Sequence, residues 1–347
     1  MSWLFVNLLA TSLNIPFLSF LRSAIDGSTF GLSYNGEEIM TEPVAVSLIW
    51  FGTGWQEPGK KAVRNAITSL TPSSYNSKHS EVPNLGDWRG VVRQYRESSN
   101  AQVSDKVDVG AECFFTGPEL NMTLDHVVQI SQTVFNKTAI ENFSRNLKCN
   151  CVFEVHENQI YQILVSHTVK FIYGQKQRQL MDLCSSKFQL HVVAGMIVNK
   201  AWVREPQNHD DHFSISFSSS YYVGSPNGDE KIDTLAGNML VQIAEEVTYR
   251  DGRGWISNDG NGLTISSSCF PPFLNAKDGP PLYANEERNI SFNAVGLNGN
   301  RYIVLHIWNQ KIKNCALAPA EICGSDAVVL KHPRGVLKGG RNCCESY

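Results

Sequence analysis

Apolar residues recur at helical spacing in the stretch between residues 226 and 247. Their spacing alternates between three residues and one, which places them on one side of an α-helix: Ile232, Leu235, Ala236, Met239, Leu240, Ile243, Ala244 and Val247. Turn-forming residues precede the run at Pro226–Gly228, and Asp251 with Gly252 offers a stop after it. The pattern predicts a core helix with one buried stripe and a polar outer face, on which Val241 and Glu245 lie together.

Other apolar runs predict strands and a second amphipathic helix. Val44–Phe51 is a β-branched and aromatic run of the length expected for a buried strand. Residues 58–70 carry apolar side chains at helical spacing, and Pro58 is placed where the first turn of a helix tolerates it. Further segments are predicted as a helix within 122–145 and as strands at 160–165, 188–203, 263–269 and 302–308.

This order of elements predicts a single α+β domain, in which helices pack on a mixed β-sheet. A long helix that follows the sheet is compatible with a zincin-like arrangement. That likeness is an analogy of architecture and says nothing about function by itself.

The glycine-containing turn after the first long strand invites comparison with a nucleotide-binding loop. Gly52-Thr-Gly54 is followed by a helix, as in such loops, but it lacks a third glycine and the Lys-Ser/Thr pair of a P-loop. The sequence therefore argues against phosphate binding at this turn.

Size and charge limit the classes of function. The chain has 347 residues, enough for a large core, and its formal net charge of −3 is close to neutral. It has no basic stripe with interleaved aromatic residues. We therefore expect no nucleic acid among its partners.

Residues 3–21 form a strongly apolar run that Asn7, Asn14 and Pro16 interrupt. We interpret residues 1–24 as a secretory signal peptide, after whose removal no other segment could span a bilayer. No Lys or Arg precedes the run and no small-x-small cleavage site follows it. A hydrophobic N-terminal tail or a mis-started reading frame remains the alternative.

Nine cysteines occur along the chain, and in a secreted protein most of them would pair. Their spacing leaves the connectivity open, and none has the CxxC spacing of a zinc ribbon or a redox site. Four sequons are candidate glycosylation sites: Asn121, Asn136, Asn142 and Asn289. Chance alone accounts for about that many, so they are compatible with secretion without demonstrating it.

Several short motifs, in order along the chain, resemble one plant protein family. They are Tyr34-Asn-Gly36, Leu48-Ile-Trp-Phe-Gly52, Asn227-Gly-Asp229, Met239–Val247 with Trp255, and Asn293–Trp308 followed by Cys315. This pattern is similar to the Exordium and phosphate-induced protein family, of which the chain looks like a divergent member over about residues 34–315. Cys184, His191 and Ala201-Trp202-Val203 match parts of the family's cysteine-rich element, but several of its cysteines are absent here.

The resemblance also bears on the predicted core helix. Some members of the family carry a metallopeptidase-like H-E-x-x-E there, whereas this chain has Val241 and Gln242 in place of the His and the first Glu, and keeps Glu245. A zinc site needs three protein ligands and an activated water. Valine cannot ligate a metal and a neutral glutamine cannot accept the proton of the water. We therefore expect no catalytic site and no cofactor at this helix.

A polar cluster, Asn208-His-Asp-Asp-His212, lies where the family's second cysteine pair is missing. Its metal-ligating candidates are His209, Asp210, Asp211 and His212, whose imidazole and carboxylate groups suit zinc. A solvated loop between strands is the more common meaning of such a cluster.

Two functions follow from these observations. The first is a secreted, non-catalytic protein of the apoplast or cell wall that binds an extracellular partner or a cell-wall component. The family resemblance implies a role in cell expansion and growth, linked to brassinosteroid response and carbon status. The second is a metal-dependent hydrolase that uses zinc with the candidates above and Glu245. In either case we expect a signal peptide at 1–24, one domain at 25–315 and a tail at 316–347.

Overall fold

The computed structural model describes most of the domain that the sequence predicts. The described residues are 31–36, 39–71, 82–116, 121–122, 148–149, 156, 158–171, 185–187, 191–193, 196–204, 224–250, 253–258, 262–269, 282–285, 287–319, 330–332 and 335–337. The expected signal peptide, the helix expected within 122–145 apart from Met122, and the cluster at 208–212 lie outside this part of the chain.

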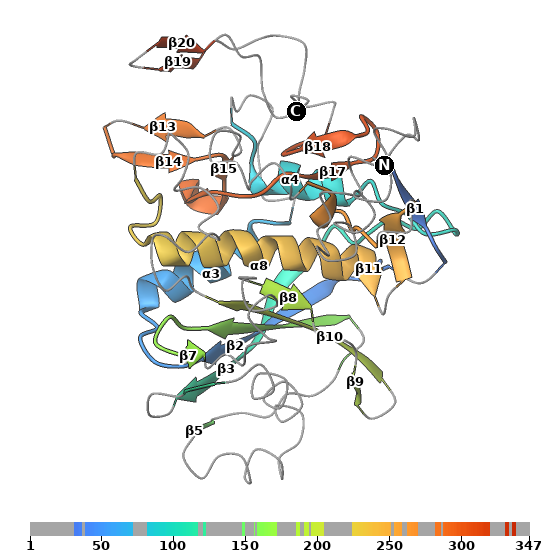
Figure 1. Cartoon of the computed structure of the whole chain (residues 1–347), viewed down its shortest axis with the longest axis horizontal. Helices are drawn as coiled ribbons and strands as arrows, with labels where there is room; N and C mark the ends of the chain where they lie inside the picture. The colour runs from blue at the N-terminus through green and yellow to red at the C-terminus, as the bar shows by residue number, and fades with distance from the viewer. Residues whose placement is uncertain are drawn as a thin grey trace, which may run out of the picture.

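A seven-stranded mixed sheet forms one layer of the molecule (Figure 1). Its main path runs through β5 (Lys148–Cys149), β3 (Val107–Thr116), β2 (Val44–Phe51), β6 (Gln159–Val165), β10 (Met196–Arg204) and β8 (Ser185–Lys187), and β9 (His191–Val193) also pairs with β10. The four central strands are parallel, and β5, β8 and β9 add antiparallel edges. The predicted mixed sheet and the strands at 44–51 and 160–165 are confirmed.

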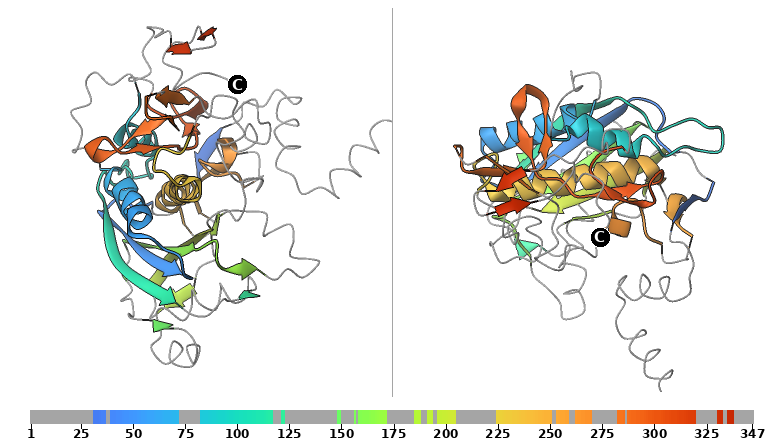
Figure 2. Two further views of the ribbon diagram at one scale, coloured as in Figure 1. Left: turned by 90° about the vertical axis from the view of Figure 1, so that its left-hand side faces the viewer. Right: turned by 90° about the horizontal axis from the view of Figure 1, so that it is seen from above.

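The described residues include three helices on the same side of this sheet: α3 (Glu57–Thr68) and α8 (Glu230–Thr248) contact the sheet, and α4 (Leu85–Val92) lies on the far side of α8 (Figures 1 and 2). The local sequence explains where they begin. Pro58 occupies the first turn of α3, and Asn84 and Asp87 exchange side-chain and backbone hydrogen bonds in a capping box at the start of α4. The long helix α8 passes between the sheet and a layer built mainly from the C-terminal part of the chain, as the left panel of Figure 2 shows.

Small antiparallel sheets contain most of the other described strands. They are β1 (Leu32–Tyr34) with β12 (Arg253–Ser257) and β11 (Tyr249–Arg250), β13 (Tyr283–Asn285) with β14 (Ile290–Phe292), β15 (Ala294–Val295) with β16 (Arg301–Tyr302), β17 (Ile307–Asn309) with β18 (Asn314–Ala316), and β19 (Leu330–His332) with β20 (Gly335–Leu337). A further pair, β4 (Asn121–Met122) with β7 (Lys170–Phe171), is parallel. With the helices and the mixed sheet these pairs confirm the predicted α+β domain.

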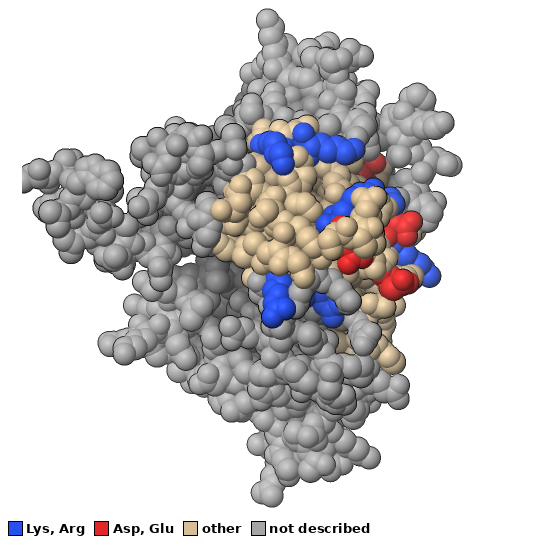
Figure 3. Space-filling model, turned by 90° about the vertical axis from the view of Figure 1, so that its right-hand side faces the viewer, with Lys and Arg blue, Asp and Glu red and all other residues tan. Residues whose placement is uncertain are grey.

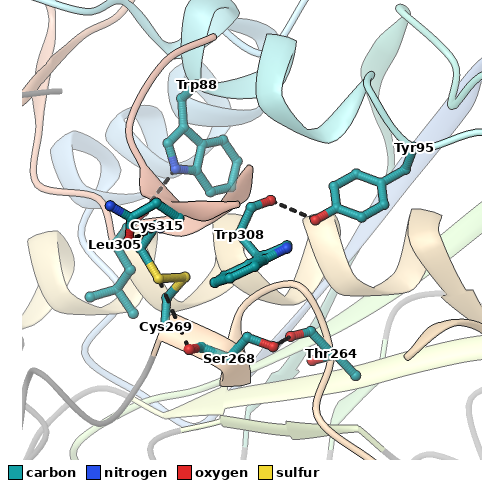
Figure 4. Close-up of a disulfide and its surroundings, with 9 residues drawn as sticks. Trp88, Tyr95, Thr264, Ser268, Cys269, Leu305, Trp308 and Cys315 are labelled. Carbon is teal, nitrogen blue, oxygen red and sulfur yellow. Dashed lines mark hydrogen bonds between the residues drawn. A yellow bond between two sulfur atoms is a disulfide. The ribbon is translucent and has the colours of Figure 1, made fainter. Parts of the chain in front are cut away.

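Two aromatic side chains, one in α4 and one just after it, bind the C-terminal layer, and a disulfide joins two segments within that layer (Figure 4). Cys269 and Cys315 form the disulfide, which joins segments 46 residues apart. The indole N–H of Trp88 donates to the carbonyl of Leu305 at 2.8 Å, and the hydroxyl of Tyr95 donates to the carbonyl of Trp308 at 2.5 Å. These buried bonds span more than 200 residues of sequence, so both ends of the chain contribute to one core.

The structure corrects two predicted strands. Residues 263–269 form turns that end in the 3₁₀ helix Ser267–Cys269, because the Ser267 hydroxyl accepts from the amide of Thr264 and takes the place of a strand partner. The strand predicted at 302–308 divides into β16 and β17, and residues 302–308 are buried throughout, not alternately.

The described core also continues past the expected end of the domain. Ala316, Leu317 and Ala318 are buried in or beside the core.

Among the described residues, no helix is both long enough and apolar enough to cross a membrane. On the face shown in Figure 3, the described Asp and Glu side chains gather at the right beside Lys and Arg, and further Lys and Arg side chains lie at the top and bottom.

Candidate functional site

Helix α8 is enclosed on all sides, which its sequence pattern did not predict. Its N-terminus is capped by Asp229, whose side chain accepts from the amide of Lys231 at 2.9 Å. The eight apolar residues of the predicted stripe are buried, as expected. The predicted polar outer face is wrong, because Val241, Gln242 and Glu245 are only 4%, 6% and 8% exposed. On the side of Glu245, Thr264 and Ser266 contact the helix, and strands β6, β8 and β10 also pack against it.

The carboxylate of Glu245 is held by two hydroxyl groups. Thr264 and Ser266 both donate to its Oε1 atom. The segment that carries them is fixed by its own hydrogen bonds, since the amide of Ser268 donates to the carbonyl of Thr264 at 3.0 Å. Glu245 is therefore a buried acceptor that ties α8 to residues 264–266, and its charge is met by hydroxyl dipoles.

The residues beside Glu245 do not suit a metal ion. The side chain of Val241 belongs to the hydrophobic core, and Gln242 carries an amide in place of a carboxylate. Within the described ranges, no group of three or more His, Cys, Asp and Glu side chains could hold a metal. The zinc that a metallopeptidase-like helix implies does not fit the donors found here, and the zincin-like analogy is not supported. His209, Asp210, Asp211 and His212 lie outside the described residues.

Comparison with known proteins places these features in a family. The model of the family described as phosphate-induced protein 1 conserved region matches residues 32–318. The chain belongs to this family. The match covers every described helix and all described strands of the mixed sheet.

Three curated relatives within the family are similar over most of their length. Protein PHOSPHATE-INDUCED 1 of Nicotiana tabacum is 24% identical over 308 residues, which cover 82% of this chain and 87% of the relative. Protein EXORDIUM of Arabidopsis thaliana is 21% identical over 302 residues, covering 82% and 88%. Protein EXORDIUM-like 5 of the same plant is 20% identical over 299 residues, covering 81% and 76%. No solved structure matches significantly.

The first turn of α8 contains a second buried acid. Asp233 is 3% exposed and accepts from the Ser225 hydroxyl and from the Asn227 amide group at 2.6 Å. The same Asn227 nitrogen donates to the carbonyl of Arg301 at 3.0 Å, so this network joins the turn before α8 to β16. Burial raises the pKa of Asp233 to about 6, because desolvation outweighs the hydrogen bonds that favour its charged form. The Asn-Gly-Asp motif of the family is thus a structural junction here.

Several buried polar groups were not predicted. Gln162 in β6 is fully buried, and neither its amide nitrogen nor its amide oxygen has a hydrogen-bond partner among the described residues. Arg89 in α4 is also fully buried and donates to the carbonyl of Ser104 at 3.0 Å. Desolvation lowers the pKa of Arg89 to about 9 and that of His306 to about 4, so His306 is neutral at physiological pH. The sequence signal that could have predicted such a buried group is a polar residue inside an apolar strand run, as Gln162 is.

One glycosylation candidate has a position that suits modification. Asn289 is exposed in the turn between β13 and β14, with a positive φ of 50° that asparagine tolerates. The backbone of Asn121 lies in β4, and Asn136 and Asn142 are outside the described ranges. Glycosylation remains a prediction at all four.

Proposed function

We propose that this chain is a secreted protein of the apoplast or cell wall that acts by binding and carries no catalytic site. Its role, carried over from what the family resemblance implies, is to promote cell expansion and growth in response to brassinosteroid and carbon status. After removal of the signal peptide it would have no membrane segment. Its partner would be extracellular.

The environment of Glu245 carries the non-catalytic part of this proposal. A metallopeptidase helix must present two ligands and a general base to a water molecule in a cleft. Here the corresponding positions are a core valine, a neutral glutamine and a carboxylate that accepts from Thr264 and Ser266. This arrangement suits a helix whose function is to hold the two layers of the domain together.

Disulfide chemistry supports the secreted part of the proposal. Cys269 and Cys315 are joined, and Cys113 is also disulfide-bonded. Such bonds form and persist in oxidising compartments and are rare in the cytosol. The exposed sequon at Asn289 is consistent with passage through the secretory pathway.

Localisation of a C-terminally tagged full-length chain in plant cells tests the secreted part. We expect the tag in the extracellular fraction, with a mobility change on enzymatic deglycosylation that the Asn289→Gln variant reduces. A cytosolic protein without glycans would refute secretion and the disulfide argument together.

A peptidase assay tests the non-catalytic part. Purified protein is incubated with a mixed peptide library, with and without a chelator, and we expect no chelator-sensitive cleavage. The double variant Val241→His, Gln242→Glu restores the family's motif and serves as the matched comparison. Chelator-sensitive cleavage by the unmodified chain would establish the alternative, a zinc-dependent hydrolase.

A further inference from the structure

The parallel strands β2 and β6 end side by side at a reversal of strand order. The sheet order is β3-β2-β6-β10, so the chain moves from β2 to one side and from β6 to the other. Ligands of open parallel sheets bind outside the carboxyl ends of the strands at such a point. β2 and β3 run toward the left of Figure 1, so the left panel of Figure 2 looks onto this end of the sheet.

Two short loops cross this end, residues 52–55 after β2 and residues 166–168 after β6, which we call the carboxyl-edge loops. Gly52 and Gly54 have φ angles of 94° and 92°, a conformation that favours glycine. A Cβ atom on Gly52 would lie 2.7 Å from Cγ2 of Val169. The glycines therefore let the first loop lie close against the second.

Hydroxyl groups join the two loops. The Ser166 hydroxyl donates to the carbonyl of Thr53 at 2.6 Å, and the Thr168 hydroxyl donates to the same carbonyl at 3.0 Å. The amide of Thr53 donates to the Thr168 oxygen at 3.3 Å. Thr53 is exposed and Thr168 is half-buried, so the two threonines reach the surface, whereas Ser166 is buried beneath them. The result is a polar surface that hydrogen bonds hold in place.

Trp55 stands beside these hydroxyls as a half-buried ring. Its indole N–H donates to the carbonyl of Phe51 at 3.2 Å, and its ring meets Trp50 edge to face with 4.9 Å between centroids. Trp50 in turn stacks on Phe114 at 6.4 Å. Because two contacts fix the indole, it could contribute an aromatic surface without loss of side-chain freedom on binding.

The charged side chains that contact Trp50 and Phe114, the aromatic pair next to Trp55, form ion pairs with one another. Arg64 donates to Glu112 at 2.6 Å and to Glu57 at 2.5 Å, and Lys60 lies 3.0 Å from Glu57. Glu57 occupies the first turn of α3, where its charge offsets the helix dipole that would attract an anion. Gln56, which is exposed, caps α3 without a side-chain hydrogen bond. These groups favour an uncharged ligand that can both donate and accept.

We propose that the carboxyl-edge loops bind a neutral sugar, with one face of the ring on Trp55 and its hydroxyls hydrogen-bonded to Thr53, Thr168 and Gln56. Sugar rings combine an apolar face with a rim of donors and acceptors, which matches an aromatic ring beside linked hydroxyls. The proposal rests on the proposed function, since it gives a chemical class to the extracellular partner.

Calorimetric titration of the purified full-length chain tests this site. The probes are the neutral oligosaccharides cellohexaose and mannohexaose, with trigalacturonic acid as the acidic counterpart. We expect at least one neutral probe to bind and the acidic one not to bind. We expect Trp55→Ala to weaken the affinity for the neutral probe by about tenfold.

Trp255→Ala is the matched control. Trp255 is also half-buried, donates its indole N–H to a backbone carbonyl at 2.9 Å, and meets Tyr95 edge to face at 5.1 Å, but it lies in β12. Its replacement should leave oligosaccharide affinity unchanged. If Trp55→Ala fails to fold, Gln56→Ala and Thr53→Val, both at exposed positions, should each weaken binding by about threefold.

Three results would overturn the sugar site: no binding of either neutral probe, binding of the acidic probe alone, or equal loss of affinity in the Trp55 and Trp255 variants. Binding to purified protein does not depend on where the protein accumulates. A cytosolic protein that binds sugar would refute secretion only, and an extracellular protein that binds neither neutral probe would refute the sugar site only.

Discussion

Helix α8 and the carboxyl-edge loops both carry polar side chains, yet they differ in what surrounds those side chains. On α8, Glu245 and Asp233 are buried and each accepts from side chains of a neighbouring segment. At the carboxyl-edge loops, Thr53 is exposed and Trp55 half-buried. Motif similarity indicates the helix as the functional region, whereas the exposure of polar and aromatic side chains indicates the carboxyl-edge loops. The helix position at which the family resemblance implies a metallopeptidase-like motif is buried here, whereas a surface without a recognised motif exposes polar and aromatic side chains.

Replacement of a core residue of α8 should have the largest effect on folding. Leu240 is fully buried in the cluster that joins the sheet to the helices. We expect Leu240→Ala to lower the free energy of unfolding by about 4 kcal/mol, because it removes buried contacts and leaves a cavity. Urea denaturation measures this. Leu240→Met, which conserves volume, should lose less than about 1.5 kcal/mol. Equal losses would contradict tight packing around α8.

Asp233 should make folding depend on pH. Its pKa is raised from 3.8 to about 6, so its stabilising contribution is fully present below its ordinary pKa and is lost as pH rises through about 6. This difference between the two pKa values corresponds to a change of about 3 kcal/mol at most in the free energy of unfolding. Thermal denaturation from pH 4 to pH 8 should show a smaller decline for Asp233→Asn than for the unmodified chain. Identical declines would show that Asp233 does not titrate in this range.

Glu245 should contribute to stability and not to catalysis. We expect Glu245→Ala to lower the free energy of unfolding by about 2 kcal/mol, because the hydroxyls of Thr264 and Ser266 lose their acceptor. Glu245→Gln keeps an acceptor oxygen and should lose less. Chemical denaturation measures both variants. A loss of peptidase activity without a loss of stability would assign the residue to catalysis instead.

Glycine replacements should distinguish the effect of backbone strain on stability from the effect of an altered loop on ligand binding. Gly54 and Gly36 have φ angles of 92° and 96°, but a Cβ on Gly54 meets Thr168 at 3.3 Å, whereas one on Gly36 meets nothing within 4 Å. Both alanine variants should lose about 1 kcal/mol of stability through strain. Only Gly54→Ala should weaken oligosaccharide binding in calorimetry. Weakened binding in both variants would remove the link between Thr168 and the ligand.

The local pattern of apolar and polar residues was sufficient to predict the main helices and strands. It was insufficient to predict what packs around them. The apolar run Val44–Phe51 predicts β2 because a strand buried on both faces needs no polar alternation. The period of α8 predicts its helix but not its enclosure. That enclosure depends on the C-terminal layer, which packs against α4 through Trp88 and Leu305, 217 residues apart. No local window contains that information.

The same limit applies to the candidate sites. The sequence shows that Val241 and Gln242 occupy the positions where the family resemblance implies a His and a Glu. The partners of Glu245 cannot be predicted, because Thr264 and Ser266 lie about 20 residues away in a segment expected to be a strand. At the turn Gly52–Gly54 the sequence carries a pattern that bears only on phosphate binding. Its pairing with residues 166–168 follows from the parallel register of β2 and β6, which only the structure supplies.

The metal content of the purified, full-length, unmodified chain tests the central claim that α8 is a structural helix. Elemental analysis after equilibration with zinc and removal of free metal should give far less than one zinc per chain, and the Glu245→Gln variant should give the same value. One zinc per chain in the unmodified protein, lost in Glu245→Gln, would show that this helix holds a metal centre and would contradict the account.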